Sequence, residues 1–172
     1  SLDSNVRMDD TDLDTVRSVK GVKEATGMYV ISGEVQFDDR KKYGFLMGSD
    51  YKNYRQLLEE VFALDLDEGN TLRGNEKSKV LLGYNYKLPE KIFERPAQLR
   101  DKLLINNHTF EVAGFYEAVG NPQDDSNIYI TKDAMESVFA PENYLWMLVR
   151  AAPGVDPTAL AEDIKDELRD HR

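Results

Sequence analysis

The chain has 172 residues, of which 41% are hydrophobic and 31% are charged, so it can bury a core beneath a soluble surface. Its formal net charge of −10 argues against a nucleic-acid-binding protein and against docking on anionic lipid, because both need a clustered excess of Lys and Arg. The sequence contains no cysteine, which excludes disulfides, thiolate metal sites and a cysteine nucleophile.

Two features bear on the cellular setting. No apolar stretch approaches the ~20 residues that a membrane helix needs, and no signal peptide is present. The sequence begins at Ser1 rather than at Met, which indicates a processed or excised piece of a longer protein. We therefore expect flanking sequence, in which membrane helices can lie.

The first predicted elements are a short helix and a long strand. Asp12 is expected to cap the helix and Gly21 to end it. The strand is expected over residues 22–37, with interruptions near Gly27 and Gly33. The apolar face of the helix consists of Leu13, Val16 and Val19.

A charged turn at residues 38–42 leads to a second strand over residues 43–47. The strongest helix signal follows over residues 54–62, because apolar side chains recur there with the period of a helix. The acidic segment 65–70 is expected to end that helix, and residues 80–82 to form a short buried strand. The helical stripe consists of Tyr54, Leu57, Leu58, Val61 and Phe62.

The run Lys102–Tyr116, KLLINNHTFEVAGFY, predicts a β-hairpin with Asn106 and Asn107 at its turn. Paired Asn tolerates the positive φ angles that a tight two-residue turn requires. Apolar residues alternate with other residues on both sides of the turn, as expected for strands that bury one face.

The last third alternates strands and helices. A strand over residues 127–130 precedes a helix that Thr131 caps and Pro141 closes. A further strand is expected over residues 144–149.

The final helix has a complete start signal. Asp156 is its N-cap, and Pro157 occupies the first helical position, where its missing N–H group costs nothing. Val155 and Leu160 stand at the two positions of a hydrophobic staple. The apolar stripe of this helix consists of Leu160, Ile164 and Leu168.

The sequence carries no catalytic motif. His108 and His171 are its two histidines, and without cysteine or an H-E-x-x-H motif they cannot supply a zinc site. It has neither a phosphate-binding P-loop nor a G-x-S-x-G nucleophile elbow. We therefore expect no catalytic, cofactor-binding or metal-binding residues.

One acidic segment resembles a calcium loop in part. Asp65, Asp67 and Glu76 stand at positions one, three and twelve of such a loop. Position five is Gly69 and position six is Asn70, where the turn needs glycine. The displaced glycine favours a solvated acidic helix exit over a calcium site.

A hydrolase with a carboxylate pair is one alternative hypothesis. Asp38–Asp39 and Asp124–Asp125 are adjacent pairs in predicted turns, and adjacent residues do not converge on one reacting atom. The hypothesis requires two of Asp38, Asp65, Asp124 and Asp125 to meet in one cleft of the folded chain.

A soluble binding module is another alternative. Tyr84 and Tyr86 share a face if the chain is extended there, and so do Tyr144 and Trp146. Such aromatic side chains can line an apolar groove for a lipid, a peptide or a lipoprotein, or they can pack in the core and at its rim.

The hairpin run resembles the pattern G-D-x-I-x-I-N-G-x-x-F-x-V-V-G in the periplasmic core domain of MacB/FtsX-like ABC transporter permeases. Further segments are similar to that family in the same order along nearly the whole chain. They are Gly21-Val22 (P-G-V in the family), FLMGSDYKNY at 45–54 (V-x-G-V-D-x-x-Y), VLLG at 80–83 (V-V-L-G) and NIYI at 127–130 (I-Y-I-P). The sequence departs from the pattern at Arg100 and Asn107, where the family has glycine, and at Thr131, where it has proline.

The resemblance implies an α+β fold with two subdomains. A porter-like antiparallel sheet of four strands, with helices on one face, is expected from residues 1–42 and 117–172. An inserted mixed α/β subdomain is expected from residues 43–116. The first and last helices are expected to end on the same side, because both must enter one membrane.

The resemblance also implies a function without enzymatic activity. The chain is expected to be the extracytoplasmic domain of an ABC transporter permease subunit in the cell membrane, where it transmits conformational change from ATP-driven membrane helices to the outside. The expected partners are a second permease subunit, identical or different, a cytoplasmic ATP-binding subunit or domain, the membrane through flanking helices and, as one option, an extracytoplasmic adaptor. No cofactor and no nucleic-acid partner is expected.

Overall fold

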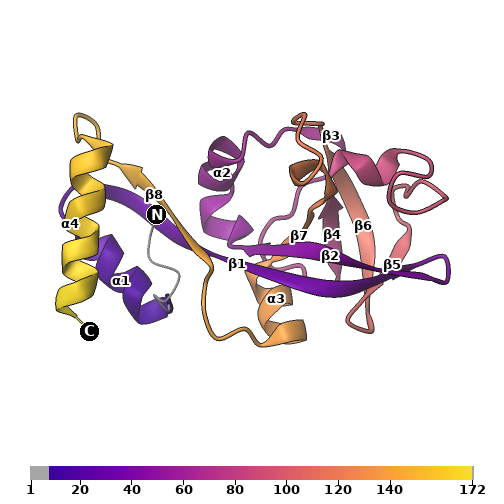
Figure 1. The fold of residues 1–172 in the computed structure, drawn as a ribbon, viewed down its shortest axis with the longest axis horizontal. Coiled ribbons are helices and arrows are strands. Elements are labelled where there is room, and N and C mark those ends of the chain that lie inside the picture. The colour runs from indigo at the N-terminus through magenta and orange to yellow at the C-terminus, as the bar shows by residue number, and fades with distance from the viewer. Residues whose placement is uncertain (1–7, 172) are drawn as a thin grey trace. The chain divides into compact units, whose positions relative to one another are not determined.

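The computed structural model describes residues 8–171, which divide into two compact units. Of the described residues, the smaller unit contains residues 8–28 with 142–171, and the larger unit contains Tyr29–Pro141. The helices are α1 (Asp10–Ser18), α2 (Tyr51–Val61), α3 (Lys132–Phe139) and α4 (Pro157–Asp170), with short 3₁₀ turns at Tyr84–Lys87 and Asp124–Ser126 (Figure 1). The strands are β1 (Val22–Phe37), β2 (Arg40–Ser49), β3 (Leu66–Gly69), β4 (Lys79–Leu82), β5 (Lys102–Ile105), β6 (His108–Tyr116), β7 (Ile128–Thr131) and β8 (Trp146–Ala151). The predicted α+β class is confirmed. None of the helices in residues 8–171 is long and apolar enough to cross a membrane.

The smaller unit is built on two antiparallel strands. The first half of β1 pairs with β8, with Ala25 opposite Val149. Residues 8–28 and 142–171 therefore contain two paired strands, whereas four strands were predicted for the porter-like sheet. The physical reason is that β7 pairs with β2 and β4 in the larger unit, with Leu46 opposite Ile128.

Helix α1 begins one turn earlier than predicted. Asp9, rather than Asp12, is its N-cap. The Asp9 carboxylate accepts a hydrogen bond from the backbone N–H of Asp12, and the Asp12 carboxylate accepts one from the backbone N–H of Asp9, both at 3.0 Å. Asp12 is therefore the third residue of a capping box, in which an acidic side chain at either position satisfies a free N–H group.

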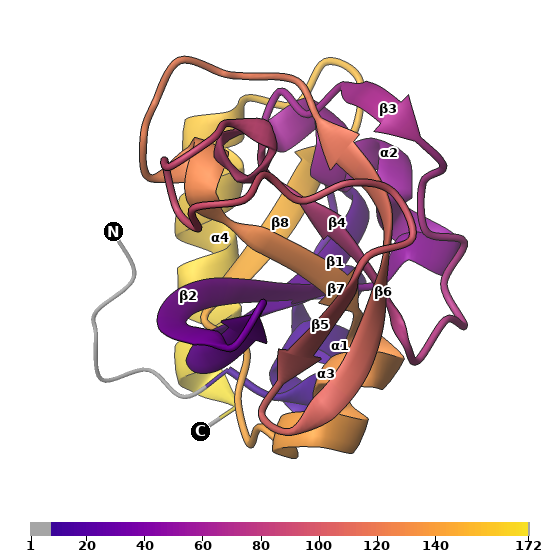
Figure 2. The same cartoon turned by 90° about the vertical axis from the view of Figure 1, so that its right-hand side faces the viewer.

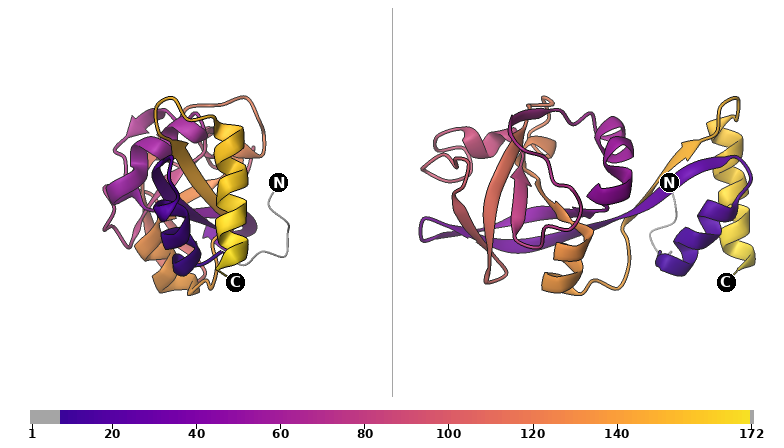
Figure 3. Two further views of the ribbon diagram at one scale, coloured as in Figure 1. Left: turned by 90° about the vertical axis from the view of Figure 1, so that its left-hand side faces the viewer. Right: turned by 180° about the vertical axis from the view of Figure 1, so that it is seen from behind.

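Helix α4 follows its prediction closely. Asp156 accepts a hydrogen bond from the backbone N–H of Thr158, and Pro157 is the first helical residue. Leu160 and Leu168 are buried. Figure 1 and the right-hand view of Figure 3 show the beginning of α1 and the end of α4 at the same end of the smaller unit.

The larger unit is a sheet that closes on itself. Its strands pair in the order β2-β7-β4-β6-β5-β1, and β1 also pairs with β2, so the pairings form a ring, which Figure 2 views from the right-hand side of Figure 1. Strand β3 adds to β6 outside this ring. The ring buries a core that includes Leu46, Leu81, Leu82, Ile105, Phe110, Phe115, Ile128 and Ile130, all of them 0% exposed.

Strand β1 is unbroken over its 16 residues, so the predicted interruptions at Gly27 and Gly33 were wrong. Both glycines are needed for close packing. A Cβ atom at Gly27 would lie 2.5 Å from a ring carbon of Tyr144, and one at Gly33 would lie 2.5 Å from a side-chain carbon of Leu46. Glycine here admits neighbouring side chains against the strand rather than ending it.

The hairpin predicted at residues 102–116 is confirmed. Asn106 and Asn107 have φ angles of 48° and 64°, and Ile105 pairs with His108 across the turn. Asp38 and Asp39 make a second turn of this kind, with φ angles of 55° and 61°. Side-chain oxygens in Asn and Asp make this left-handed backbone tolerable.

Two further predictions concern the region between these hairpins. Helix α2 is confirmed, although it begins at Tyr51, with Asp50 as its N-cap. The segment predicted only to end that helix contains strand β3, in which Glu68 pairs with Phe115. A four-residue strand with acidic, half-exposed residues has no apolar pattern of its own, so its pairing with β6 decides its conformation.

The predicted subdomain boundaries near residues 43 and 116 both lie inside the larger compact unit, which runs from Tyr29 to Pro141. The predicted division places residues 1–42 with 117–172 in one subdomain and residues 43–116 in the other. It divides the chain at other points than the two compact units do, and it stays a prediction.

Arg100 has a φ angle of 73°, where an L-residue other than Asn or Asp is strained. Replacing Arg100 by Gly is therefore expected to raise the free energy of unfolding by about 0.5–1 kcal/mol, measured by urea denaturation. Arg73→Gly is the matched control, because Arg73 is also an exposed loop residue but has no positive φ angle. It should lower stability by about 0.5–1 kcal/mol through chain entropy alone. Equal effects of the two substitutions would contradict the assignment of strain to Arg100.

Candidate functional site

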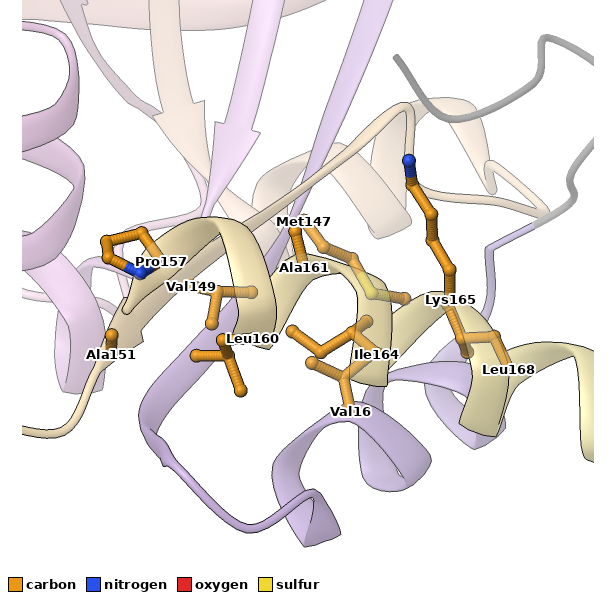
Figure 4. A pocket seen from close by; sticks show the side chains of 10 residues that line it. All are labelled: Val16, Met147, Val149, Ala151, Pro157, Leu160, Ala161, Ile164, Lys165 and Leu168. Carbon is orange, nitrogen blue, oxygen red and sulfur yellow. The ribbon is translucent and has the colours of Figure 1, made fainter. Parts of the chain in front are cut away.

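The smaller unit contains an apolar groove of about 400 Å³ between α4, α1 and β8 (Figure 4). Strand β8 contributes every second residue, so its three side chains share one face. Helix α4 contributes side chains of one stripe, and α1 contributes Val16. The lining residues are Val16, Met147, Val149, Ala151, Pro157, Leu160, Ala161, Ile164, Lys165 and Leu168.

Part of the groove belongs to the core, and part is open to solvent. Val16, Leu160 and Leu168 are buried, at 1%, 3% and 5% exposure. Met147 and Ile164 are only half-buried, so the groove presents apolar surface to a ligand. Lys165 is the one charged residue among those that line it. With apolar walls and one cation, this groove is suited to bind apolar groups.

The sequence predicted the stripe of α4 but not the groove. The stripe appears as helical periodicity within one element. Val16 and Met147 join it from segments that are distant along the chain, and no local signal reports that they meet.

The predicted aromatic pairs do not form this groove. Tyr86 is 5% exposed, and its hydroxyl donates a hydrogen bond to the backbone carbonyl of Ser126 at 3.1 Å. Tyr144 is 4% exposed and lies against Gly27. Trp146 is 42% exposed and is absent from the lining residues of the groove.

The two histidines have separate structural positions. His108 is exposed at the start of β6, directly after the hairpin turn. His171 follows α4, and its ring lies 3.5 Å from the Glu167 carboxylate. In residues 8–171, no contact places His108 or His171 beside a candidate nucleophile.

The acidic segment that resembles a calcium loop uses its carboxylates internally. Asp67 forms an ion pair with Lys87 at 2.5 Å. Glu76 accepts hydrogen bonds from the backbone N–H groups of Arg73 and Gly74 at 2.8 and 2.9 Å. Across the described residues 8–171, no group of three or more His, Asp or Glu side chains is arranged to hold a metal ion.

Two of the four carboxylates of the hydrolase hypothesis have separate partners. Asp38 pairs with Arg95 at 2.9 Å. Asp125 is buried, and its carboxylate accepts hydrogen bonds from the backbone N–H groups of Val119 and Gly120 at 2.8 and 3.2 Å. Asp38 and Asp125 thus hold a turn and a loop in place, and their contacts give no support to a catalytic pair.

Several tyrosines of the larger unit are buried close together. The hydroxyls of Tyr51 and Tyr116 are hydrogen-bonded at 2.9 Å, and the rings of Tyr116 and Tyr129 meet edge to face at 5.0 Å. Burial raises the pKa of Tyr51, Tyr86 and Tyr116 well above the usual value, and it raises the pKa of Tyr129 to about 12. Burial disfavours the charged phenolate, which has lost its hydration.

The raised pKa values predict that stability falls at alkaline pH. Below a pH of about 10 Tyr129 is neutral in both the folded and the unfolded state, so its full contribution to stability is present. As pH rises from about 10 to about 12, the unfolded chain ionises at Tyr129 while the folded chain does not, at a cost of roughly 1.4 kcal/mol per pH unit. Urea denaturation followed by circular dichroism over this range should show the midpoint falling steadily.

Tyr129→Phe is the control for this alkaline effect. The variant cannot ionise at position 129, so its stability should fall less steeply between pH of about 10 and about 12 than that of the parent chain. A parallel fall in both proteins would show that Tyr129 titrates normally in the folded state.

Comparison with known proteins adds to this picture. A model of the family described as MacB-like periplasmic core domain matches residues 3–167. An ABC transporter permease of Methanocaldococcus jannaschii is 30% identical in an alignment of 164 residues that covers 92% of this chain. The aligned part spans only 39% of that relative's length.

Three solved structures share the fold. The extracellular domain of the noncanonic ABC-type transporter YknZ from Gram-positive bacteria has a TM-score of 0.75 and 18% identity, over 96% of this chain and 84% of its own. The periplasmic region of MacB from Actinobacillus actinomycetemcomitans has a TM-score of 0.74 and 17% identity, over 97% and 76%. A domain of a putative permease protein from Porphyromonas gingivalis has a TM-score of 0.64 and 16% identity, over 99% and 73%.

Proposed function

Because the chain belongs to the family of MacB-like periplasmic core domains, we propose that it is the extracytoplasmic domain of an ABC transporter permease subunit. In this proposal the parent protein lies in the cell membrane, and the domain transmits conformational change from ATP-driven membrane helices to the outside. ATP is hydrolysed in a separate cytoplasmic subunit or domain, and a second permease subunit completes the transporter. An extracytoplasmic adaptor is a further partner that this arrangement can accommodate.

One observation carries the proposal. The beginning of α1 and the end of α4 lie at the same end of the smaller unit (Figure 3). Chain segments that continue from both can therefore enter one membrane. The two helices also pack against one another and line one groove together with β8, so we expect a movement of either flank to reach the other elements of this unit.

The location of the domain is tested by labelling. This chain has no cysteine, so His108→Cys, at an exposed position of the hairpin, introduces a unique thiol within it. In whole cells that contain the full-length protein with any other cysteine removed, a membrane-impermeant maleimide should label this thiol without lysis. Labelling only after lysis would contradict an extracytoplasmic location.

Transmission is tested by loosening the connection to the flank. An environment-sensitive fluorophore on the same thiol should report a change when ATP is added to the full-length transporter. A flexible Gly-Ser linker inserted after Asp170 should abolish that change, because a flexible chain does not pass on force. The same linker inserted after Gly120, an exposed loop glycine with open space around it, is the control and should preserve it. Equal effects of both insertions would argue against transmission through α4.

A binding module for a lipid, peptide or lipoprotein is the second candidate, and the apolar groove of Figure 4 favours it. A lysophospholipid should then raise the melting temperature of the chain, since a ligand of the folded state stabilises it. Ala161→Trp fills the groove from α4 and should abolish the increase. No increase with the parent chain at saturating lipid would count against this candidate.

A further inference from the structure

The larger unit contains a polar pocket of about 510 Å³. Its walls come from the segment after β3, from the residues just before β5 and from the middle of β6. Three cations line it, Arg73, Lys79 and Arg100, together with two carboxylates. Such a concentration of positive side chains is notable in a chain with a net charge of −10.

In the part of the chain that the structure describes, the three cations make no direct polar contact, although Lys79 and Arg100 lie close enough to Glu111 to lower its pKa. Within residues 8–171, none of their side chains forms a hydrogen bond or an ion pair. Other cations of the same unit are paired, as Arg95 is with Asp38 at 2.9 Å. The three side chains therefore remain available to an anionic ligand.

The two carboxylates of the pocket are already engaged. Glu76 accepts hydrogen bonds from the backbone N–H groups of Arg73 and Gly74, and Glu111 pairs with Lys102 at 2.8 Å. Burial by itself would raise the pKa of Glu76, but these backbone hydrogen bonds outweigh it and lower the pKa. Lys79 acts electrostatically on both carboxylates and Arg100 acts on Glu111, so the carboxylates offset part of the positive charge. Three cations against two carboxylates leave a net charge of +1 on the lining of the pocket.

Two further features belong to residues that line the same pocket. The Thr71 hydroxyl is buried in the wall of the pocket and has no hydrogen-bond partner among the described residues. A buried hydroxyl without a partner costs free energy that a bound acceptor would recover. Arg100 holds a strained backbone conformation, with φ at 73°, and strain of this kind is often retained where a side chain serves a ligand.

We propose that this pocket binds an oxyanion, either a phosphate or a carboxylate group of a small ligand. The guanidinium groups of Arg73 and Arg100 and the ammonium group of Lys79 supply charge-assisted donors, and the Thr71 hydroxyl supplies a neutral one. Guanidinium groups match the paired oxygens of carboxylate and phosphate. The volume falls within the range of small-molecule sites, and the polar walls suit a charged group rather than an acyl chain. Binding here does not depend on transport, so it can be measured on the chain by itself.

The binding test is a titration of the 172-residue chain, followed by the amide resonances in nuclear magnetic resonance spectra. Inorganic phosphate and acetate are added in separate titrations, with chloride replaced to keep the ionic strength constant. We expect saturable shifts concentrated in residues 69–79, 99–101 and 111–113 with at least one of the two anions. Saturation by phosphate alone assigns the site to a phosphate group, and saturation by acetate alone assigns it to a carboxylate. No saturable shift with either anion would overturn the proposal.

Substitutions distinguish anion binding in the pocket from general charge effects. Lys79→Gln and Arg73→Gln should each weaken binding by about tenfold, because each removes one charge-assisted hydrogen bond. Lys91→Gln, at an exposed lysine outside the pocket, is the matched control and should leave binding unchanged. Arg100→Gly should weaken binding while raising the melting temperature, which separates lost binding from lost folding. Equal weakening by Lys91→Gln would show non-specific screening and overturn the site.

Discussion

Replacing Phe110 by Ala is expected to lower the free energy of unfolding of the larger unit by about 3–5 kcal/mol. Phe110 lies in β6, is 0% exposed, and stands opposite Leu103 in the hairpin. Strand β6 pairs with β3, β4 and β5, so its backbone cannot move inward to fill the space left by the ring. The lost transfer free energy and the remaining cavity therefore add. Urea denaturation followed by far-ultraviolet circular dichroism measures the loss.

Thr109→Ala is the control for this substitution. Thr109 is the neighbour of Phe110, stands opposite Leu104 and is exposed, because successive residues of a strand point to opposite faces. Its replacement should change stability by less than about 0.5 kcal/mol. A large effect of Thr109→Ala together with a small effect of Phe110→Ala would mean that β6 presents the other face to the core.

The hairpin was predictable because its information is local. Asn106 and Asn107 favour the left-handed turn, and the alternation of apolar residues from Leu103 to Val112 fixes which face is buried. Helix α4 was predictable for the same reason, since Asp156 and Pro157 signal its start within two residues.

The errors occurred where distant segments decide the structure. Gly27 and Gly33 predicted breaks in a strand, but each is a point where a side chain from another element packs closely against the backbone. Strand β3 carries no strand signal of its own and forms because β6 offers it a partner. These contacts join distant segments and leave no local pattern in a single sequence.

The same limit applies to the candidate sites. The apolar groove joins Val16 of α1 to Met147 of β8, and the polar pocket joins Arg73 to Arg100. In each case the residues have ordinary roles in their own segments. Only the tertiary structure makes them neighbours, so the sequence predicted one wall of the groove and nothing of the pocket.

The three departures from the family pattern have backbone conformations that suit the residues of that pattern. Arg100 and Asn107 stand where the pattern has glycine, and both have positive φ angles, of 73° and 64°. Thr131 stands where the pattern has proline and has a φ angle of −69°, close to the value that a proline ring imposes. Thr131 also caps α3, because its hydroxyl accepts a hydrogen bond from the backbone N–H of Ala134 at 3.0 Å. The fold thus accommodates all three residues in these backbone conformations. The cost in conformational free energy is highest for Arg100.

Replacing Gly27 by Ala is expected to lower the free energy of unfolding of the smaller unit by about 3 kcal/mol. The added Cβ atom would lie 2.5 Å from a carbon of the Tyr144 ring, well inside van der Waals contact. The ring cannot easily move away. Its hydroxyl donates a hydrogen bond to the Asp10 carboxylate, and the backbone N–H of Tyr144 donates one to the carbonyl of Met8 at 2.7 Å. Trp146 is the single tryptophan of the chain and lies in β8, so its fluorescence during urea denaturation reports on this unit.

A double-mutant cycle tests whether the clash with Tyr144 is the cause. Once Tyr144→Ala has removed the ring, adding Gly27→Ala should cost almost nothing, which gives a coupling of about 2–3 kcal/mol between the two positions. Gly44→Ala is a strand-glycine control, because its Cβ atom would meet no atom closer than 3.3 Å, and it should have a much smaller effect. If Gly27→Ala costs the same with and without the Tyr144 ring, its effect arises from strand β1 itself. The role of Gly27 as the site where Tyr144 packs against β1 would then be wrong.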